Sequence, residues 1–334
     1  MSIEPLTITK LKHRAYYLCS NEDCSLYLVA AKDGNVSILD EKFQVSKEFS
    51  FEAEIEDISF GQDGKNLGLA FSKIGTVNII DLDNRTIFKA ESDLEFESCL
   101  QVKNFLWCIE RVDEYKVQCA VYDVKEQRKI TTISLEDPYG NSSFSLDYIP
   151  QHNIVVLWIA AGQDGQRIIW VNFDGKNIDV QEEPYIEDTL PPTFNDVGTE
   201  FLVADDQCVF KYSYPQKEIL SVYEHPEDSY LGYDLCYIDD NKALFSTEDS
   251  RIYLLDTNEM TIIKEIIISG HEPKTTEYYY PSLIGEDELC TDISYFKRFG
   301  NKILVVFKEN AENSSESWED SILIFDVNQF KWEK

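Results

Sequence analysis

The sequence contains little of what marks several common classes of protein. Glycine occurs 14 times and methionine twice in 334 residues, so neither glycine-rich linkers nor a methionine-rich adaptable groove is indicated. The longest apolar runs, residues 154–161 and 261–268, have the length of strands and fall short of the roughly 18 residues that a transmembrane helix needs. The first residues lack the apolar segment of a secretory signal. We therefore expect a soluble protein with no membrane partner.

Cysteine is present, but in no arrangement typical of a disulfide framework or a metal site. None of the eight cysteines forms a CxxC pair, and the closest two, Cys19 and Cys24, have four residues between them. Cys108 and Cys119 lie within apolar strand patterns, where a free cysteine behaves as a small hydrophobic residue. We expect reduced cysteines in a cytoplasmic protein, or a nuclear one if the source is eukaryotic, with no bound metal or cofactor.

Catalytic motifs are missing as well. The four histidines show no paired spacing, and no HExxH, GxSxG, phosphate-loop or EF-hand motif occurs. The best catalytic candidate would combine His271, Glu272 and Cys290 on one loop. Loops of this composition often supply such a trio by chance, so we expect that the chain is not an enzyme.

Basic residues are outnumbered two to one. The chain has 62 acidic and 30 basic residues, which gives a formal net charge of −32. A field of this sign repels nucleic acid and anionic membranes and attracts basic partners. Two interpretations stay open: the charge serves solubility alone, or it serves the binding of a basic protein or basic peptide segment.

The chain is rich in one repeated phrase, a short β-branched or aromatic run that ends in Asp. Five copies end at Asp40, Asp81, Asp123, Asp256 and Asp326, and two weaker copies end at positions 172 and 213. The steps between successive ends are 41, 42, 49, 41, 43 and 70 residues. A period of about 40–45 residues built from short strands is typical of the blades of a β-propeller.

Each repeat contains four strand patterns separated by turn residues, most clearly in residues 55–90. The phrase ISFGQDGKNLGLAF resembles the WD40 repeat, and the repeated aspartates fall where that family has Trp-Asp. No blade has Trp before the Asp, and the only Gly-His pair is Gly270-His271. The chain is therefore similar to a divergent WD40-like propeller, which implies an all-β fold of seven four-stranded antiparallel blades and a non-enzymatic interaction protein.

We expect one seven-bladed domain over residues 1–334. Either a strand at residues 3–11 completes the last blade, or FKWE at the C-terminus completes it alone. An open sheet edge would invite aggregation. The predicted blades cover residues 12–50, 55–92, 96–135, 143–181, 193–223, 231–268 and 290–334.

The step of 70 residues contains two insertions, residues 269–290 and 308–321. In the WD40-like strand order both emerge on one face of the propeller, as does the shorter link 135–143, which carries Asp137. Acidic and aromatic residues dominate the two insertions, and such residues anchor protein interfaces. The predicted partner-binding residues are Glu272, Glu277, Tyr278, Tyr279, Tyr280, Glu286, Asp287, Glu288, Glu316, Trp318, Glu319 and Asp320.

The leading interpretation is a cytoplasmic adaptor or escort, monomeric on its own, whose acidic face near blade seven binds a basic protein partner. The alternative is a bacterial immunity protein that neutralises a basic toxin, because an acidic surface matches a positive nucleic-acid site. The third is a propeller enzyme with a site in the central funnel.

Overall fold

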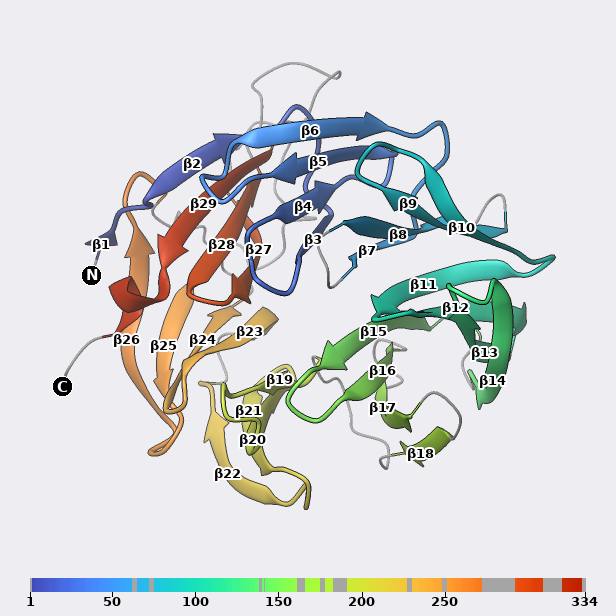
Figure 1. Cartoon of the computed structure of the whole chain (residues 1–334). Coiled ribbons are helices and arrows are strands. Elements are labelled where there is room, and N and C mark those ends of the chain that lie inside the picture. Colours follow the sequence, from blue (N-terminus) through green and yellow to red (C-terminus); the bar gives the residue numbers. More distant parts are fainter. Residues whose placement is uncertain are drawn as a thin grey trace. The chain divides into compact units, whose positions relative to one another are not determined.

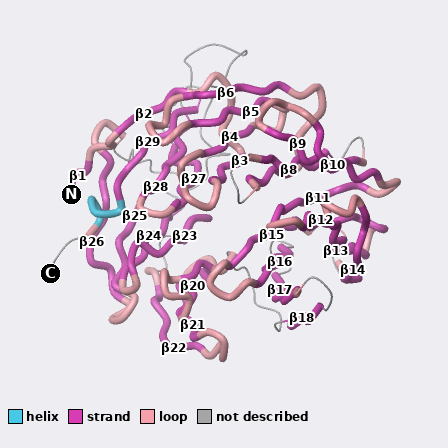
Figure 2. Tube along the Cα trace, viewed as in Figure 1, coloured by secondary structure: helices cyan, strands magenta, loops and turns pink. Residues whose placement is uncertain are grey.

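The computed structural model consists of seven β-sheets that follow one another along the chain (Figures 1 and 2). The residues that it describes are 2–61, 65–71, 75–137, 140, 142–160, 166–174, 178–182, 191–226, 230–247, 251–271, 292–308 and 320–331. Each sheet has four antiparallel strands, and one of the seven carries a fifth, parallel strand from the N-terminus. This confirms the prediction of a seven-bladed β-propeller with four-stranded antiparallel blades.

The chain divides into two compact units, one formed by residues 15–188 and the other by residues 1–14 with 189–334. The first unit holds blades one to four. Blade one consists of β3 (Tyr17–Ser20), β4 (Tyr27–Ala30), β5 (Asn35–Leu39) and β6 (Val45–Ser50), and blade two consists of β7 (Asp57–Phe60), β8 (Asn66–Phe71), β9 (Thr76–Asp81) and β10 (Thr86–Glu91). Blade three consists of β11 (Glu95–Val102), β12 (Phe105–Asp113), β13 (Lys116–Asp123) and β14 (Arg128–Glu136). Blade four consists of β15 (Ser143–Ile149), β16 (Ile154–Ala160), β17 (Gln166–Phe173) and β18 (Ile178–Glu182).

The second unit holds blades five to seven. Its strands are β19 (Thr193–Phe194), β20 (Glu200–Ala204), β21 (Cys208–Ser213) and β22 (Ile219–Glu224) in blade five, β23 (Leu231–Asp239), β24 (Lys242–Thr247), β25 (Ile252–Asp256) and β26 (Thr261–Ile268) in blade six, and β27 (Asp292–Phe299), β28 (Lys302–Lys308) and β29 (Asp320–Asp326) in blade seven.

Two N-terminal strands add to the sheets of the second unit. Strand β2 (Thr7–Lys10) pairs antiparallel with β29 and is the fourth strand of blade seven, while β1 (Ser2–Ile3) pairs parallel with β26. The C-terminal segment forms no strand at Phe330 and Lys331, where the sequence predicts the start of FKWE as one. Residues Val327–Phe330 instead form a short 3-10 helix (Figure 2), because Asp326 accepts a hydrogen bond from the Asn328 N–H and caps it.

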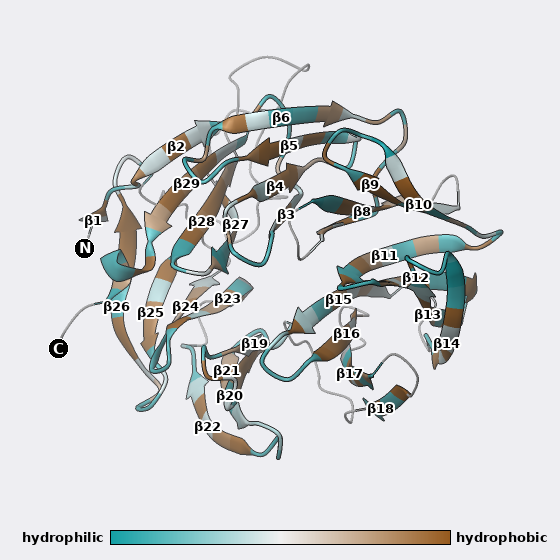
Figure 3. Cartoon of the chain, viewed as in Figure 1, coloured by the Kyte–Doolittle hydropathy of each residue, from teal (hydrophilic) through white to brown (hydrophobic). Residues whose placement is uncertain are grey.

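The hydrophobic core lies between neighbouring blades within each unit. Trp107 and Val121 of blade three pack with Leu157 and Val171 of blade four, and all four side chains are buried. Similar clusters join blades one and two, two and three, five and six, and six and seven. Figure 3 shows hydrophobic residues along strands such as β5, β25 and β28. Since each large side chain contributes about 1.5–3 kcal/mol on burial, these clusters hold adjacent blades together.

The aspartate that ends the repeated phrase stabilises the turn that follows it. Asp40 Oδ1 accepts hydrogen bonds from the N–H groups of Lys42 at 2.9 Å and Gln44 at 3.0 Å. Asp81 does the same in blade two. Aspartate suits this position because its short side chain reaches backbone donors two residues further on. Asp123, Asp256 and Asp326 also accept hydrogen bonds from backbone N–H groups of the turns that follow them, two or three residues further on. The repeated aspartates therefore serve the fold.

Candidate binding site

Most of the predicted partner-binding residues lie outside the described residues: Glu272, Glu277, Tyr278, Tyr279, Tyr280, Glu286, Asp287, Glu288, Glu316, Trp318 and Glu319. The surface that they would form stays a prediction. Asp320 is described and is 3% exposed. It begins β29 and pairs with Lys308 of β28, so the hairpin continues into the segment where the sequence indicates a loop. The side chain of Asp320 is consequently withdrawn from the surface.

Asp137 is also buried, although the sequence places it on an exposed link. Its carboxylate accepts a hydrogen bond from Ser142 Oγ at 2.6 Å and forms an ion pair with Arg111 at 3.2 Å. Arg111 in turn pairs with Glu97. Breaking a buried ion pair on one side leaves a charge without its partner and costs several kcal/mol, about 3–5. This network therefore fixes the link between blades three and four.

Exposed acidic residues gather elsewhere, at one end of the first three sheets. At this end each link between blades folds onto the turn between the second and third strands of the preceding blade, as the hydrogen bonds from Phe51 N to Gly34 O and from Ser92 N to Gly75 O show. We call the following exposed residues the acidic rim: Asp33, Glu52, Glu54, Glu91, Asp93, Glu95, Asp113, Glu114 and Glu136.

Two tyrosines lie among the acidic rim residues. Tyr16 is 53% exposed and Tyr115 is 52% exposed, and the Lys32 ammonium lies 4.5 Å from the centre of the Tyr16 ring. The rim thus combines the residue types that the sequence assigns to the blade-seven loops. Sequence reasoning found only the part of the rim in the link 135–143, which contains Glu136, because loop length was the criterion and the other links are short.

A pocket lies at the opposite end of the strands, between blades three and four. It has a volume of about 170 Å³. Its apolar part is formed by the rings of Phe105, Trp107 and Phe173, together with valines of both blades. Phe173 meets Phe105 at an angle of 74° and Trp107 at 88°, with ring centres 5.0 and 5.7 Å apart. This edge-to-face packing fixes the three rings as rigid walls.

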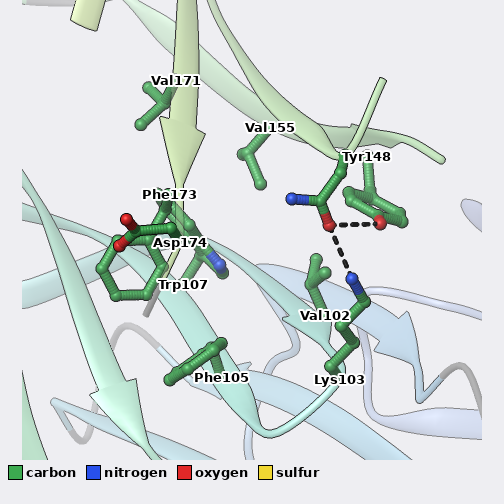
Figure 4. A pocket seen from close by; sticks show the side chains of 10 residues that line it. Val102, Lys103, Phe105, Trp107, Tyr148, Val155, Val171, Phe173 and Asp174 are labelled. Carbon is green, nitrogen blue, oxygen red and sulfur yellow. Dashed lines mark hydrogen bonds between the residues drawn. The ribbon is translucent and has the colours of Figure 1, made fainter. Parts of the chain in front are cut away.

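The polar part of the pocket comes from the hairpin turns of the two blades (Figure 4). Lys103, between β11 and β12, donates a hydrogen bond of 2.6 Å to Asn153 Oδ1, and the Tyr148 hydroxyl donates one of 3.1 Å to the same atom. Because lysine is a donor only, the amide oxygen of Asn153 must face it, which leaves the Asn153 NH₂ group as the remaining donor. Asp174, which follows β17, adds a carboxylate.

Corresponding turns of neighbouring blades thus supply Lys103 and Asn153, and both have a positive φ, +54° and +53°. Sequence reasoning did not select either residue. The signal that could have found them is their position in the repeat. The turn between the first and second strands lies at the same end of each blade, so polar residues in these turns of neighbouring blades can contact each other.

The described residues offer little for catalysis. No group of three or more His, Cys, Asp and Glu among them could hold a metal ion. Burial raises the pKa of the Cys99 and Cys108 thiols and raises that of Cys119 to about 12, and a protonated thiol is a poor nucleophile. The ring of His271 packs against Phe307, with centres 4.3 Å apart, while Glu272 and Cys290 lie outside the described residues. No helix in the described part of the chain is long and apolar enough to cross a membrane.

Comparison with solved structures identifies the fold as that of WD40 β-propellers. The chain is similar to the β-propeller domain of Cps50 (Swd1) from Myceliophteria thermophila, with a TM-score of 0.63, 11% identity, and coverage of 95% of this chain and 98% of that one. It is similar to U3-55K with a TM-score of 0.62, 13% identity and the same coverage. No protein-family model matches the sequence, and no curated protein sequence matches it. At these identities the likeness concerns the fold alone.

Proposed function

We propose that this chain is a non-enzymatic scaffold that binds a basic segment of another protein. The observation that carries the proposal is the net charge of −32 on a propeller fold, which is commonly used for protein interaction. A field of this strength raises the local concentration of cationic partners and their association rate.

The acidic rim and the blade-seven loops are the two candidate contact surfaces. The rim presents carboxylates from Asp33 to Glu136 beside two exposed tyrosines. Tyrosine and charged residues together supply the anchors that dominate many interfaces. The loops carry the same residue types in the sequence, among them Glu286, Asp287 and Glu288. The buried Asp137 and Asp320 take no part.

Three triple charge reversals distinguish these surfaces. Glu52, Asp93 and Glu95 test the rim, and Glu286, Asp287 and Glu288 test the loops. Glu22, Glu41 and Glu126, which are exposed at the opposite end of the strands, form a control with the same change of net charge. Each residue is changed to Lys, and the readout is the affinity for a lysine- and arginine-rich peptide at low and high salt.

We expect that binding weakens steeply with salt. We also expect that the rim variant or the loop variant loses about tenfold or more in affinity, while the control variant loses far less, because screening and distance reduce the effect of remote charges. Equal losses in all three variants would indicate a non-specific field effect. Binding that is insensitive to both salt and the rim and loop reversals would contradict the proposal.

A further inference from the structure

We propose that the pocket between blades three and four binds the free C-terminal carboxylate and the last, apolar side chain of a protein segment. The inference rests on the proposed function in one respect, namely that the segment is basic. It adds a specific site, at the other end of the strands from the acidic rim, and a specific chemical group.

The charge arrangement of the pocket fits a terminal carboxylate. A terminal carboxylate needs donors, and the pocket is lined by Lys103 and Asn153, whose side chains are joined by the hydrogen bond from the Lys103 ammonium to Asn153 Oδ1. Asp174 lies on the other side of the pocket in Figure 4, where a carboxylate attracts the N–H or the cationic side chain of the preceding residues. The pocket thus carries a positive charge on one side and a negative charge on the other. This arrangement fits a chain end, which has both an anionic carboxylate and adjacent donor groups, better than it fits a simple cation or a simple anion.

The size and the lining of the pocket fit one apolar side chain. The volume of about 170 Å³ is below the roughly 300–1,000 Å³ of pockets that take drug-sized ligands, so the pocket would enclose only part of a nucleotide or a large cofactor. One apolar side chain fits, and Phe105, Phe173 and Val155 form an apolar wall for it. Burial of such a side chain supplies affinity, while the polar groups set orientation.

The net charge of the chain decides the source of the carboxylate. A small free acid approaches a chain of net charge −32 against its field, whereas a carboxylate at the end of a basic segment is carried in by the charge of that segment. We therefore assign the pocket to a peptide terminus.

The test uses the backbone conformation of Lys103. Its φ of +54° suits glycine, so Lys103→Gly removes the ammonium without straining the turn. Lys217 has nearly the same φ, +58°, in blade five, and Lys217→Gly is a control with the same residue, backbone conformation and charge change. The probes are a basic peptide that ends in leucine with a free carboxylate, its C-terminal amide, and the free acid that ends in serine.

For the wild-type chain, the leucine acid should bind about tenfold more tightly than the amide, which corresponds to about 1.4 kcal/mol, and more tightly than the serine acid. Lys103→Gly should abolish the preference for acid over amide, and Lys217→Gly should keep it. A diazirine analogue of the terminal leucine should cross-link to the segments 102–107, 148–155 or 171–174. Equal binding of acid and amide, or equal effects of the two glycine variants, would overturn the inference.

A neutral peptide that ends in leucine separates this inference from the proposed function. If basic peptides gain nothing over neutral ones, but the neutral acid still binds in a Lys103-dependent way, the pocket stands and the basic partner fails. If basic peptides bind and the reversals at Glu52, Asp93 and Glu95 weaken them without any acid preference, the proposed function stands and the pocket assignment fails.

Discussion

Two junctions between blades are built on the same plan and differ in chemistry. In blade two, Asp57 accepts hydrogen bonds from Ser98 Oγ at 2.6 Å and from the Cys99 N–H at 2.9 Å, both on the first strand of blade three. In blade six, Asp234 accepts one from the N–H of Phe296 on the first strand of blade seven. The carboxylate of one blade thus ties down the backbone of the next in both places.

The difference lies in the donors around each carboxylate. Asp57 is half-buried and also accepts from the Ile58 N–H at 2.8 Å. Asp234 is 9% exposed and has Ser246 Oγ at 3.3 Å as its side-chain donor. Burial raises the pKa of Asp234 to about 7, because few donors compensate for the lost hydration of the charge. Corresponding positions of a repeat therefore share a backbone role while the donors around the two carboxylates differ.

The largest effect is expected when the first junction is broken. Asp57→Ala removes the acceptor of two buried donors, the Ser98 hydroxyl and the Cys99 N–H, so the free energy of unfolding should fall by about 3 kcal/mol. Asp147 is an exposed inner-strand aspartate that accepts from the Tyr148 N–H, and Asp147→Ala is the control. Similar denaturant midpoints for the two variants would show that the junction contributes nothing specific.

The second prediction concerns pH. The folded chain holds a proton on Asp234 up to about pH 7, while the unfolded chain loses it near 4, so this group lowers stability as pH rises between these values, by up to about 1.4 kcal/mol per pH unit. Asp234→Asn keeps a neutral acceptor at every pH. At pH 8 it should be more stable than the wild type, because the wild type has then lost the stabilisation that the proton on Asp234 gives at low pH, and at pH 4 the difference should vanish.

The measurement is the difference in denaturant midpoint between variant and wild type at several pH values, which cancels the titration of all other carboxylates. Asp240→Asn, at an exposed position after the same strand, removes the same formal charge and is the control. A pH-independent difference for Asp234→Asn would mean that Asp234 is ionised throughout.

The serines at the two junctions provide a third, smaller contrast. Ser98→Ala removes a 2.6 Å hydrogen bond to a carboxylate and should cost about 2 kcal/mol, since bonds to charged groups are the stronger class. Ser246→Ala removes a 3.3 Å bond and should cost about 0.5–1 kcal/mol below pH 6, where Asp234 is neutral. Equal costs at pH 5 would remove the distinction between the junctions.

Much of this fold could be predicted from the sequence, because strand alternation and turn residues are local signals. The spacing of Asp40, Asp81 and Asp123 reports a turn in which the aspartate itself bonds the backbone, so the pattern and its cause coincide. The ends of the chain were harder to predict. The pairing of β1 with β26 joins residues more than 260 positions apart, and no local pattern specifies such a partner.

The candidate site was less predictable for the same reason. Lys103 and Asn153 are ordinary turn residues in the sequence, and their contact depends on the packing of two blades. The burial of Asp137 depends on Arg111, which lies 26 positions earlier. Residue type and loop length indicate exposure only where no such partner is near, and partners across blades are not visible in a single sequence.

The smallest effect is expected where the repeat itself departs from its pattern. In blade five the turn-capping position is Ser213, whose hydroxyl accepts from the Glu218 N–H at 3.2 Å, and the following Lys217 has the positive φ typical of these turns. Ser213→Asp should strengthen this acceptor and stabilise the chain by about 0.5 kcal/mol, measured at moderate salt so that repulsion in an acidic chain is screened. The reverse change, Asp81→Ser in blade two, should cost a similar amount, because it replaces a carboxylate that accepts two N–H bonds. If both changes destabilise, the turn of blade five is adapted to serine, and the capping positions differ between blades just as the junction aspartates do.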